Sequence, residues 1–347
     1  MKQLSREEAL FRTAPVGRAI AALAVPTILS QIITVIYNMA DTFFIGQLGD
    51  PNQVAAATIG MPPFMILTAL ANLFGVGGAS LISRALGAGD REKAGRGSAF
   101  CIWAAACAAI VYSLAMLFLR PVLLPILGAD AATEGYASSY LFWTITLGAL
   151  PSVLNPMLAH LVRAEGHARQ ASLGVALGGV LNIALDPLFL FVFSMDITGA
   201  AIATLLSNCT AMIYFFVFLR RIRGESALRS SPRCISLRGG IPGEVLSVGL
   251  PSCLVSVMAM ISNTALNHII AGYSNEAVAG MGIAKKLNML AFAIGQGITQ
   301  GTLPLIGYNY SSGDRARMMR AVRVLLVDCI AVSLAVTAVL YFCAAPF

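Results

Sequence analysis

Long apolar segments recur along the whole chain and are separated by short polar connections. A helix needs about 20 apolar residues to span a bilayer, and nine segments reach that length. Each is predicted to be a transmembrane helix, which makes the chain an all-α polytopic membrane protein. The nine predicted spans are residues 19–46, 54–83, 97–119, 135–161, 170–193, 198–219, 246–271, 278–308 and 321–345.

Composition places the chain in lipid rather than in water. Hydrophobic residues make up 58% of the 347 residues and charged residues only 11%, whereas a soluble domain carries about 25% charged residues. The seven cysteines lie mostly inside apolar runs without a CxxC pair, and the three histidines do not cluster. We therefore expect no disulfide framework, no metal centre and no cofactor. The apolar stretch after residue 18 is too long for a cleavable signal peptide and should remain as the first span.

Basic residues are distributed unequally between the predicted connections. With the N-terminus inside, the inner connections hold all but three of the 23 lysines and arginines, Arg163 and Arg169 among them. The outer connections hold only Arg120, Lys285 and Lys286. This distribution follows the positive-inside rule and predicts a cytoplasmic N-terminus in the inner (cytoplasmic) membrane. It also explains the net charge of +7 without nucleic-acid binding.

An internal repeat relates two distant parts of the chain. Segment 24–45 matches segment 249–270, and an even number of predicted spans lies between them, so both copies enter the membrane from the same side. Such a parallel repeat builds two lobes related by an axis along the membrane normal, with the substrate path between them. The matching pairs are Val25-Pro26-Thr27 with Leu250-Pro251-Ser252, Asn38 with Asn263, Ala40 with Ala265, Ile45 with Ile270 and, after a one-residue shift, Gly89-Asp90-Arg91 with Gly313-Asp314-Arg315.

The repeat predicts the organisation of the chain into lobes. Residues 1–222 form a six-helix N-terminal lobe, residues 223–245 a cytoplasmic inter-lobe loop, and residues 246–347 a partial C-terminal lobe of three helices. Because the second lobe has half the spans of the first, we predict that the natural protein continues beyond Phe347. A longer reading frame with three more apolar spans would support this expectation.

Two aspartates within the first lobe are candidates for function. Asp41 lies late in the first span and shares a helix face with Tyr37, four residues earlier. Asp186 lies late in the fifth span and shares a face with Asn182. Both aspartates fall in the outer half of the membrane on the predicted topology. An aspartate at the bilayer centre costs about 2.5–3.5 kcal/mol, which favours a partner or a cavity beside it.

The chemistry of these groups predicts a site for a coupling cation. Two carboxylates close together in a low dielectric cannot both stay charged without a cation, so the pair is expected to hold a proton or a sodium ion. Asn182 and a hydroxyl such as Thr204 can add oxygen ligands. Pro26 and Pro187 each free a backbone carbonyl and are candidate helix hinges. The alternative is a buried hydrogen-bonded network without a role in transport.

An adaptable cavity wall is a further expectation. Methionine and aromatic side chains can repack around varied ligands, although ordinary helix packing explains any single one of them. Lys285 and Lys286 either reach the outer interface or line the cavity. Asp328 is either solvated near the basic inner end of the last span or functional. The expected cavity residues are Met39, Met61, Phe64, Met65, Asn155 and Met157.

Five sequence motifs resemble the multidrug and toxic compound extrusion (MATE) family, and the similarity runs in order through the chain. The Asn-x-x-x-Asp-Pro element together with the Asp-Thr element is fairly specific for that family. The matching pieces are Ala24-Val25-Pro26, Asn38-Met39-Ala40-Asp41-Thr42-Phe43-Phe44-Ile45-Gly46, Arg163-Ala164-Glu165-Gly166, Leu181-Asn182-Ile183-Ala184-Leu185-Asp186-Pro187 and Gly199-Ala200-Ala201-Ile202-Ala203-Thr204.

The resemblance implies two six-helix lobes that work by alternating access. In the DinF-like branch of the family, the first lobe carries an acidic cation site. The NorM-like branch instead has a glutamate in helix seven, at a position that is Ala259 here. The sequence is therefore similar to the DinF-like and MepA-like side of the family. By matching motif, the cation site comprises Asp41, Asn182, Asp186 and Thr204, with Tyr37 nearby.

These observations predict a secondary active transporter. We expect an antiporter that exports small organic molecules, including drugs, across the cytoplasmic membrane in exchange for a proton or a sodium ion. The substrate is expected to be hydrophobic or cationic, the protein a monomer, and no enzymatic activity is expected. A lipid-linked precursor flippase is the alternative, which would need a basic cavity that only Lys285 and Lys286 could supply. A membrane-embedded transferase ranks lowest, because no DxxxD or DDxxD motif occurs.

Overall fold

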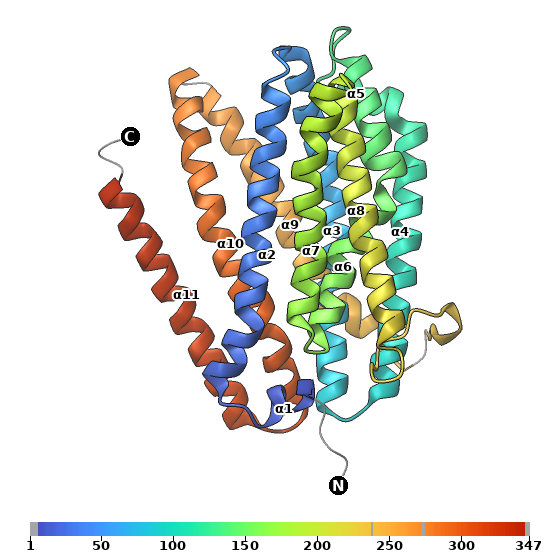
Figure 1. Ribbon diagram of the computed structural model, residues 1–347, viewed down its shortest axis with the longest axis vertical. Helices are drawn as coiled ribbons and strands as arrows, with labels where there is room; N and C mark the ends of the chain where they lie inside the picture. Colours follow the sequence, from blue (N-terminus) through green and yellow to red (C-terminus); the bar gives the residue numbers. More distant parts are fainter. Residues whose placement is uncertain (1–5, 237–238, 272–274, 344–347) are drawn as a thin grey trace.

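The computed structural model describes residues 6–236, 239–271 and 275–343, and these are helical nearly throughout (Figure 1). Long helices run side by side and are joined by short turns. The elements are α1 (Arg6–Arg12), α2 (Val16–Gly46), α3 (Pro51–Gly87), α4 (Arg91–Ile126), α5 (Glu134–Leu141), the π-helical turn η1 (Phe142–Leu147), α6 (Ala149–Ala164), α7 (Ala168–Pro187), the π-helical turn η2 (Leu188–Val192), α8 (Asp196–Arg221), the 3₁₀ turn η3 (Pro232–Cys234), α9 (Ile241–Ala271), α10 (Asn275–Ser311) and α11 (Arg315–Cys343).

All nine predicted spans correspond to helices of the structure. Within the described residues, eight helices are long and apolar enough to cross a membrane. The remaining span, which is the fourth along the chain, is broken: the helices over Glu134–Leu147 and Ala149–Ala164 meet at 51°. Gly148 stands at the break, where an added Cβ would lie 2.3 Å from the carbonyl oxygen of Thr144. The chain is therefore an all-helical, multi-pass membrane protein, and the fourth span bends where only glycine fits the tight turn.

The internal repeat is visible in the geometry of the two copies. Helices α2 and α9 both have 31 residues, and α3 and α10 both have 37. Gly89 after α3 and Gly313 after α10 have φ angles of 80° and 83°. The aspartates that follow, Asp90 and Asp314, accept hydrogen bonds of 2.8 and 2.9 Å from the backbone amide three residues later, which caps α4 and α11. The Gly-Asp-Arg match thus marks the same turn in both copies.

The two copies contact each other closely at the end of the molecule that carries α1. A Cβ added to Gly249 of α9 would lie 2.0 Å from the carbonyl oxygen of Leu73 on α3. A Cβ added to Gly301 of α10 would lie 2.6 Å from the Cα of Ala24 on α2. Small residues let helix backbones approach in lipid, where no hydrophobic force draws helices together. Further glycines at the same contact are Gly77, Gly87, Gly297 and Gly307.

At the opposite end the lobes stand apart. Several apolar residues of α9 beyond Pro251 are exposed, including Leu254, Val255, Met258 and Ile261. The face of α9 that carries Ser256 stays half-buried against α3. Helix α10 packs against α2, and α10 and α11 diverge from the first lobe towards the end opposite α1 (Figure 1). The lobes therefore close on the side of α1 and open on the other side.

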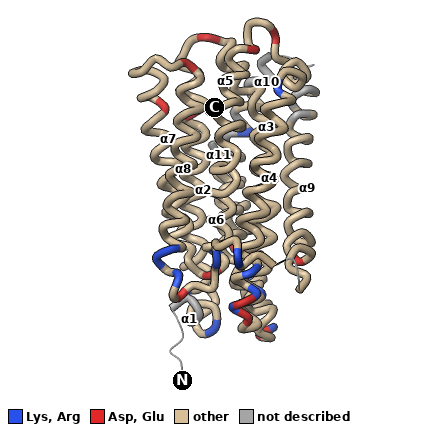
Figure 2. The backbone as a smooth tube through the Cα atoms, turned by 90° about the vertical axis from the view of Figure 1, so that its right-hand side faces the viewer, with Lys and Arg blue, Asp and Glu red and all other residues tan. Residues whose placement is uncertain are grey.

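Basic residues gather at the closed end of the molecule, beside α1 (Figure 2). This is the end that the positive-inside rule assigns to the cytoplasm. An ion cluster joins the lobes there. Glu244 of α9 accepts from Lys93 at 2.5 Å, and its other oxygen lies 3.4 Å from Arg84. We refer to this closed end as the inner side and to the open end as the outer side.

The predicted inter-lobe loop is shorter than expected and is docked on the first lobe. Helix α9 begins at Ile241 rather than at residue 246. The buried carboxylate of Glu165 accepts hydrogen bonds of 2.5 Å from the hydroxyl of Ser226 and from the backbone amide of Ala227. These contacts fix the loop against the inner end of α6. The cysteines whose side chains are described are unpaired.

Candidate functional site

The aspartate of the fifth span is fully enclosed at the outer end of α7. Asp186 has 0% of its surface exposed. Asn182, one turn earlier, directs its amide nitrogen to Asp186 Oδ1 at 3.3 Å and to the hydroxyl of Thr204 on α8 at 3.4 Å. The helical period places Asn182 and Asp186 on one face, and α8 brings Thr204 opposite them. Three of the residues in the predicted cation site are therefore in one hydrogen-bonded group.

Asp41 reaches the same region from α2. Its carboxylate is close enough to Asp186 for the two charges to interact. Within the described part of the chain, Asp41 Oδ1, Asp186 Oδ2 and Asn182 Oδ1 are buried without a hydrogen-bond donor. Buried oxygens normally have a partner, because an unsatisfied one costs about 1–3 kcal/mol. The structure thus brings together two carboxylates and an amide whose oxygens are available to a cation.

Two tyrosines border this group. The ring of Tyr37 packs on α7 at Gly179, where an added Cβ would lie 3.0 Å from the ring. Tyr140 of α5 was missed by sequence reasoning, although its phenol is within electrostatic reach of Asp41 and Asp186. Its ring occupies the space left by Gly60 of α3, at 2.7 Å from an added Cβ. No sequence motif identifies Tyr140, because its position depends on the packing of α5 against α3.

The kind of ligand atom in the acidic group determines which ions can bind to it. Carboxylate, amide and hydroxyl oxygens are the ligands of hard cations, whereas soft metals prefer sulfur and imidazole. Among the described residues, no three histidines, cysteines or acids are grouped as the ligands of a metal ion would be. The arrangement can therefore bind a proton on one carboxylate, or a sodium ion between the oxygens.

The two candidate hinge prolines occupy different settings. Helix α2 runs through Pro26 without a break, and the hydroxyl of Thr27 donates to the carbonyl of Leu23 at 2.8 Å. Pro187 is the last residue of α7 and leads into the π-helical turn over Leu188–Val192. The backbone therefore changes its helix type directly beside Asp186.

Three of the expected cavity methionines lie on faces that point between the lobes. Met61 and Met65 share a face of α3 with Asn72, whose amide donates to Ser256 of α9 at 3.1 Å. Both methionines are exposed. Met39 is exposed as well and lies eleven residues, or about three turns, beyond Ile28, which contacts Gly297 of α10. By helical register these side chains continue the faces of α2 and α3 that contact the second lobe further in.

The other expected cavity residues are built into the first lobe. Met157 is fully buried in the main core, so its assignment to the cavity wall is wrong. Phe64 is partly buried and packs on the same core. The amide of Asn155 donates to the side-chain oxygen of Asn208 at 2.9 Å, which ties α6 to α8. Methionine fills core gaps as readily as it lines cavities, and sequence alone does not separate the two uses.

Three charged residues of the later spans belong to α10 and α11, outside the first lobe. Lys285 on α10 is half-buried and has an interaction partner, while the side chain of Lys286 lies outside the described residues. Asp328 is half-buried on α11, a helix whose most apolar window has 0% of its residues buried. These two helices contribute none of the residues of the acidic group.

Arg163 does not lie at the inner surface, as the positive-inside interpretation assumed. Only 3% of its surface is exposed, and it lines a cavity between the lobes together with His160. An arginine in the last turn of a span gives the same sequence signal whether it faces water or protein. Like the position of Tyr140, the burial of the Arg163 guanidinium could not be predicted from the sequence.

Comparisons with known proteins agree with this geometry. The family model named MatE matches residues 26–188 and 251–347. The second matched stretch begins at Pro251, which the internal repeat places opposite Pro26. Multidrug export protein MepA of Staphylococcus saprophyticus is 32% identical over 332 residues, which cover 96% of this chain and 72% of that protein. MepA of Staphylococcus aureus is 30% identical over 318 residues, which cover 92% of this chain and 70% of that protein.

A solved structure has the same fold. It is described as the outward-facing conformation of a multidrug resistance MATE family transporter of the MOP superfamily. It superposes with a TM-score of 0.92 at 27% sequence identity, over 99% of this chain and 76% of that one.

Proposed function

This chain belongs to the MatE family of multidrug and toxic compound extrusion proteins, and we propose that it exports small organic molecules in exchange for a cation held between Asp41 and Asp186. The family and the MepA relatives support a multidrug efflux transporter. The lipid-linked precursor flippase, which the sequence left as the alternative, is not favoured by these relatives. The family is one of transport proteins rather than enzymes.

The observation that carries the proposal is the set of unsatisfied oxygens in the first lobe. Asp41, Asp186 and Asn182 each have a buried oxygen without a donor among the described residues. A cation bound here supplies a partner for oxygens that otherwise have none, and it removes the repulsion between the two carboxylates. The coupling ion is a proton or a sodium ion, because the same oxygens suit both.

The open outer side provides the route by which drug and cation are exchanged. The lobes touch through glycine contacts on the inner side and stand apart on the outer side, and the chain superposes on a transporter structure described as outward-facing. The cation enters from outside and binds the first lobe. Helix α2 then changes shape near Pro26, and the drug leaves from the wall formed by Met39, Met61 and Met65. The cation drives this step only through different affinities for the two conformations.

Orientation and substrate follow from the same features. The basic end beside α1 faces the cytoplasm, so the N-terminus is cytoplasmic and the open side faces outward. The exposed methionine wall favours hydrophobic or cationic substrates of varied shape. The protein works as a monomer in this scheme, since one chain supplies both the cation site and the drug-facing wall.

Transport by the full chain in proteoliposomes tests the proposal, with a pH gradient and a sodium gradient imposed separately. One gradient should drive a fluorescent cationic dye across the membrane, and the other should not. Protein-free liposomes and a dissipated gradient are the controls. If the dye moves at the same rate with no gradient, with either gradient alone and with both gradients together, export is not coupled to a cation and the proposal is contradicted.

A further inference from the structure

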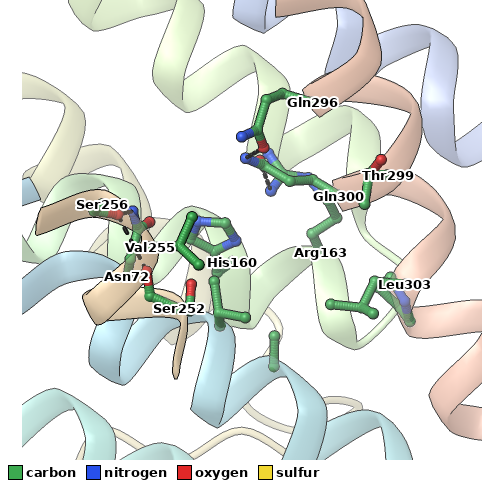
Figure 3. A pocket seen from close by; sticks show the side chains of 13 residues that line it. Asn72, His160, Arg163, Ser252, Val255, Ser256, Gln296, Thr299, Gln300 and Leu303 are labelled. Carbon is green, nitrogen blue, oxygen red and sulfur yellow. Dashed lines mark hydrogen bonds between the residues drawn. The ribbon is translucent and has the colours of Figure 1, made fainter. Parts of the chain in front are cut away.

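A polar cavity lies between the lobes, and no residue of the acidic group lines it (Figure 3). Its volume is about 240 Å³, and α3, α6, α9 and α10 contribute its walls. None of the cation-site helices α2, α7 and α8 contributes a lining residue. Its polar lining residues include Asn72, His160, Arg163, Ser256, Gln296 and Gln300.

Arg163 gives this cavity its charge. The guanidinium stays protonated in proteins, and it is buried with 3% exposure. Its Nη1 donates to Gln300 Oε1 at a long 3.4 Å, and its Nε has no acceptor within the described residues. No aspartate or glutamate is among the lining residues. A buried charge without a counter-charge is strongly unfavourable. An anion bound in the cavity would therefore supply the negative partner that Arg163 lacks among the lining residues.

The remaining polar groups of the wall favour an acceptor ligand. Gln300 donates its own amide nitrogen to Gln296 Oε1 at 3.1 Å, which leaves the amide nitrogen of Gln296 as a donor. Figure 3 shows Arg163 and both glutamines converging from α6 and α10, with His160 on the other side of the cavity. Gly75 leaves the space for His160, since an added Cβ would lie 2.8 Å from its ring. The wall therefore offers a cation and several hydrogen-bond donors.

We propose that this cavity binds a small carboxylate anion, held by Arg163. The free Nε and the adjoining amino nitrogen form the planar edge that pairs with both oxygens of a carboxylate. The volume suits a small anion, because drug-sized pockets run from about 300 to 1,000 Å³. The amide of Gln296 supplies a further donor from the second lobe.

Binding there links the two lobes. Arg163 belongs to α6 of the first lobe, and Gln296 belongs to α10 of the second. An anion between them reinforces the inner contact and so stabilises the outward-open conformation. The site uses other helices and the opposite charge from the proposed cation site, so it stands or falls independently of that proposal.

Thermal unfolding of the purified full chain tests the proposal at constant ionic strength. Sodium acetate should raise Tm in a saturable way, because a ligand that binds the folded state stabilises it according to its Kd. The Arg163→Gln variant should bind acetate at least about tenfold more weakly, since it loses the charge and the paired donors. Arg169→Gln, which removes an exposed arginine of α7, should respond like the parent.

A second variant keeps the test decisive if Arg163→Gln does not fold correctly. Gln296→Leu keeps the guanidinium and removes a donor on the second lobe, and it should weaken acetate binding measured by saturation-transfer NMR. Equal acetate affinity in the parent, Arg163→Gln and Gln296→Leu would overturn the proposal. Saturable stabilisation by chloride or inorganic phosphate but not by acetate would overturn the assignment to a carboxylate.

Discussion

Asn182 and Asp186 lie one turn apart on α7, and the amide of Asn182 donates to Asp186 Oδ1 at 3.3 Å. The other oxygen of Asp186 is buried without a donor in the described part of the structure. The protein thus orients one oxygen of the carboxylate and leaves the second one available. This arrangement fits the cation site proposed above, because the available oxygen is the one that a cation would contact.

Replacing either carboxylate by its amide should abolish drug export. Asp41→Asn and Asp186→Asn each remove the negative charge that attracts the cation, while they keep nearly the same shape. We expect dye efflux in everted vesicles to fall by at least about tenfold, which corresponds to about 1.4 kcal/mol of lost coupling. Asp328→Asn removes an acid of α11 outside the site and is the matched control. Wild-type efflux in Asp41→Asn and Asp186→Asn would rule out their role in coupling.

The contact between Gly249 and Leu73 should control the balance between conformations. In Gly249→Ala, the new methyl group meets the carbonyl oxygen of Leu73 at 2.0 Å unless the helices separate. Overpacking of this kind costs about 1–3 kcal/mol, so the outward-open state should lose population. Spin labels on the inner ends of α3 and α9 would report the larger separation.

Gly243→Ala is the matched control for that substitution. Gly243 lies on the same helix, and an added Cβ meets nothing within 4 Å. Alanine in a helix is favoured over glycine by about 0.5–1 kcal/mol, so this variant should keep the parental distances. Identical distance distributions in Gly249→Ala and Gly243→Ala would show that the inner contact is not held by close backbone packing.

The ion cluster at Glu244 should contribute only modestly to inner closure. Its members are about one-third exposed, and such pairs are worth about 0–1 kcal/mol with strong screening by salt. Glu244→Gln should shift the same spin-label distances slightly, and the shift should disappear at high salt. Glu92→Gln breaks a pair with Arg96 within α4 and should leave the distances unchanged. A large, salt-independent effect of Glu244→Gln would contradict this assignment.

Glu165 should determine whether the inter-lobe loop stays docked. Its carboxylate accepts hydrogen bonds from the hydroxyl of Ser226 and the backbone amide of Ala227. Without the carboxylate these buried donors are unpaired, which costs about 1–3 kcal/mol for each donor. Glu165→Ala should therefore speed tryptic cleavage after Arg233, which is exposed in this loop. The exposed side chain of Glu225 makes Glu225→Ala a suitable comparison. Cleavage at the parental rate in Glu165→Ala would show that other contacts suffice.

The sequence predicted the helical architecture because lipid imposes a length on each apolar run. It also placed Asp41 with Tyr37 and Asp186 with Asn182, since both pairs follow from the helical period. The Gly-Asp-Arg turn could be matched between copies because glycine at positive φ and a capping aspartate are local requirements. These features depend on neighbours in sequence.

Features that depend on packing between distant helices could not be read in this way. Tyr140 joins the acidic group through the space left by Gly60, and Met157 is buried where an exposed position was expected. Arg163 was interpreted by the positive-inside rule, which counts charge near span ends but does not say which way a side chain points. The positions of these three side chains depend on how each helix is rotated about its axis and on which helices of the two lobes pack against it.

The central claim is that the Asp41–Asp186 pair couples cation entry to drug exit, and proteoliposomes can separate coupling from drug binding. The Asp41→Asn/Asp186→Asn double variant should exchange labelled for unlabelled drug across the membrane, because its neutral amides remove the repulsion between the two carboxylates and leave the methionine wall intact. The same liposomes should fail to accumulate drug under the pH or sodium gradient that drives the parent protein. Gradient-driven accumulation by the double variant at the parental rate would contradict the account.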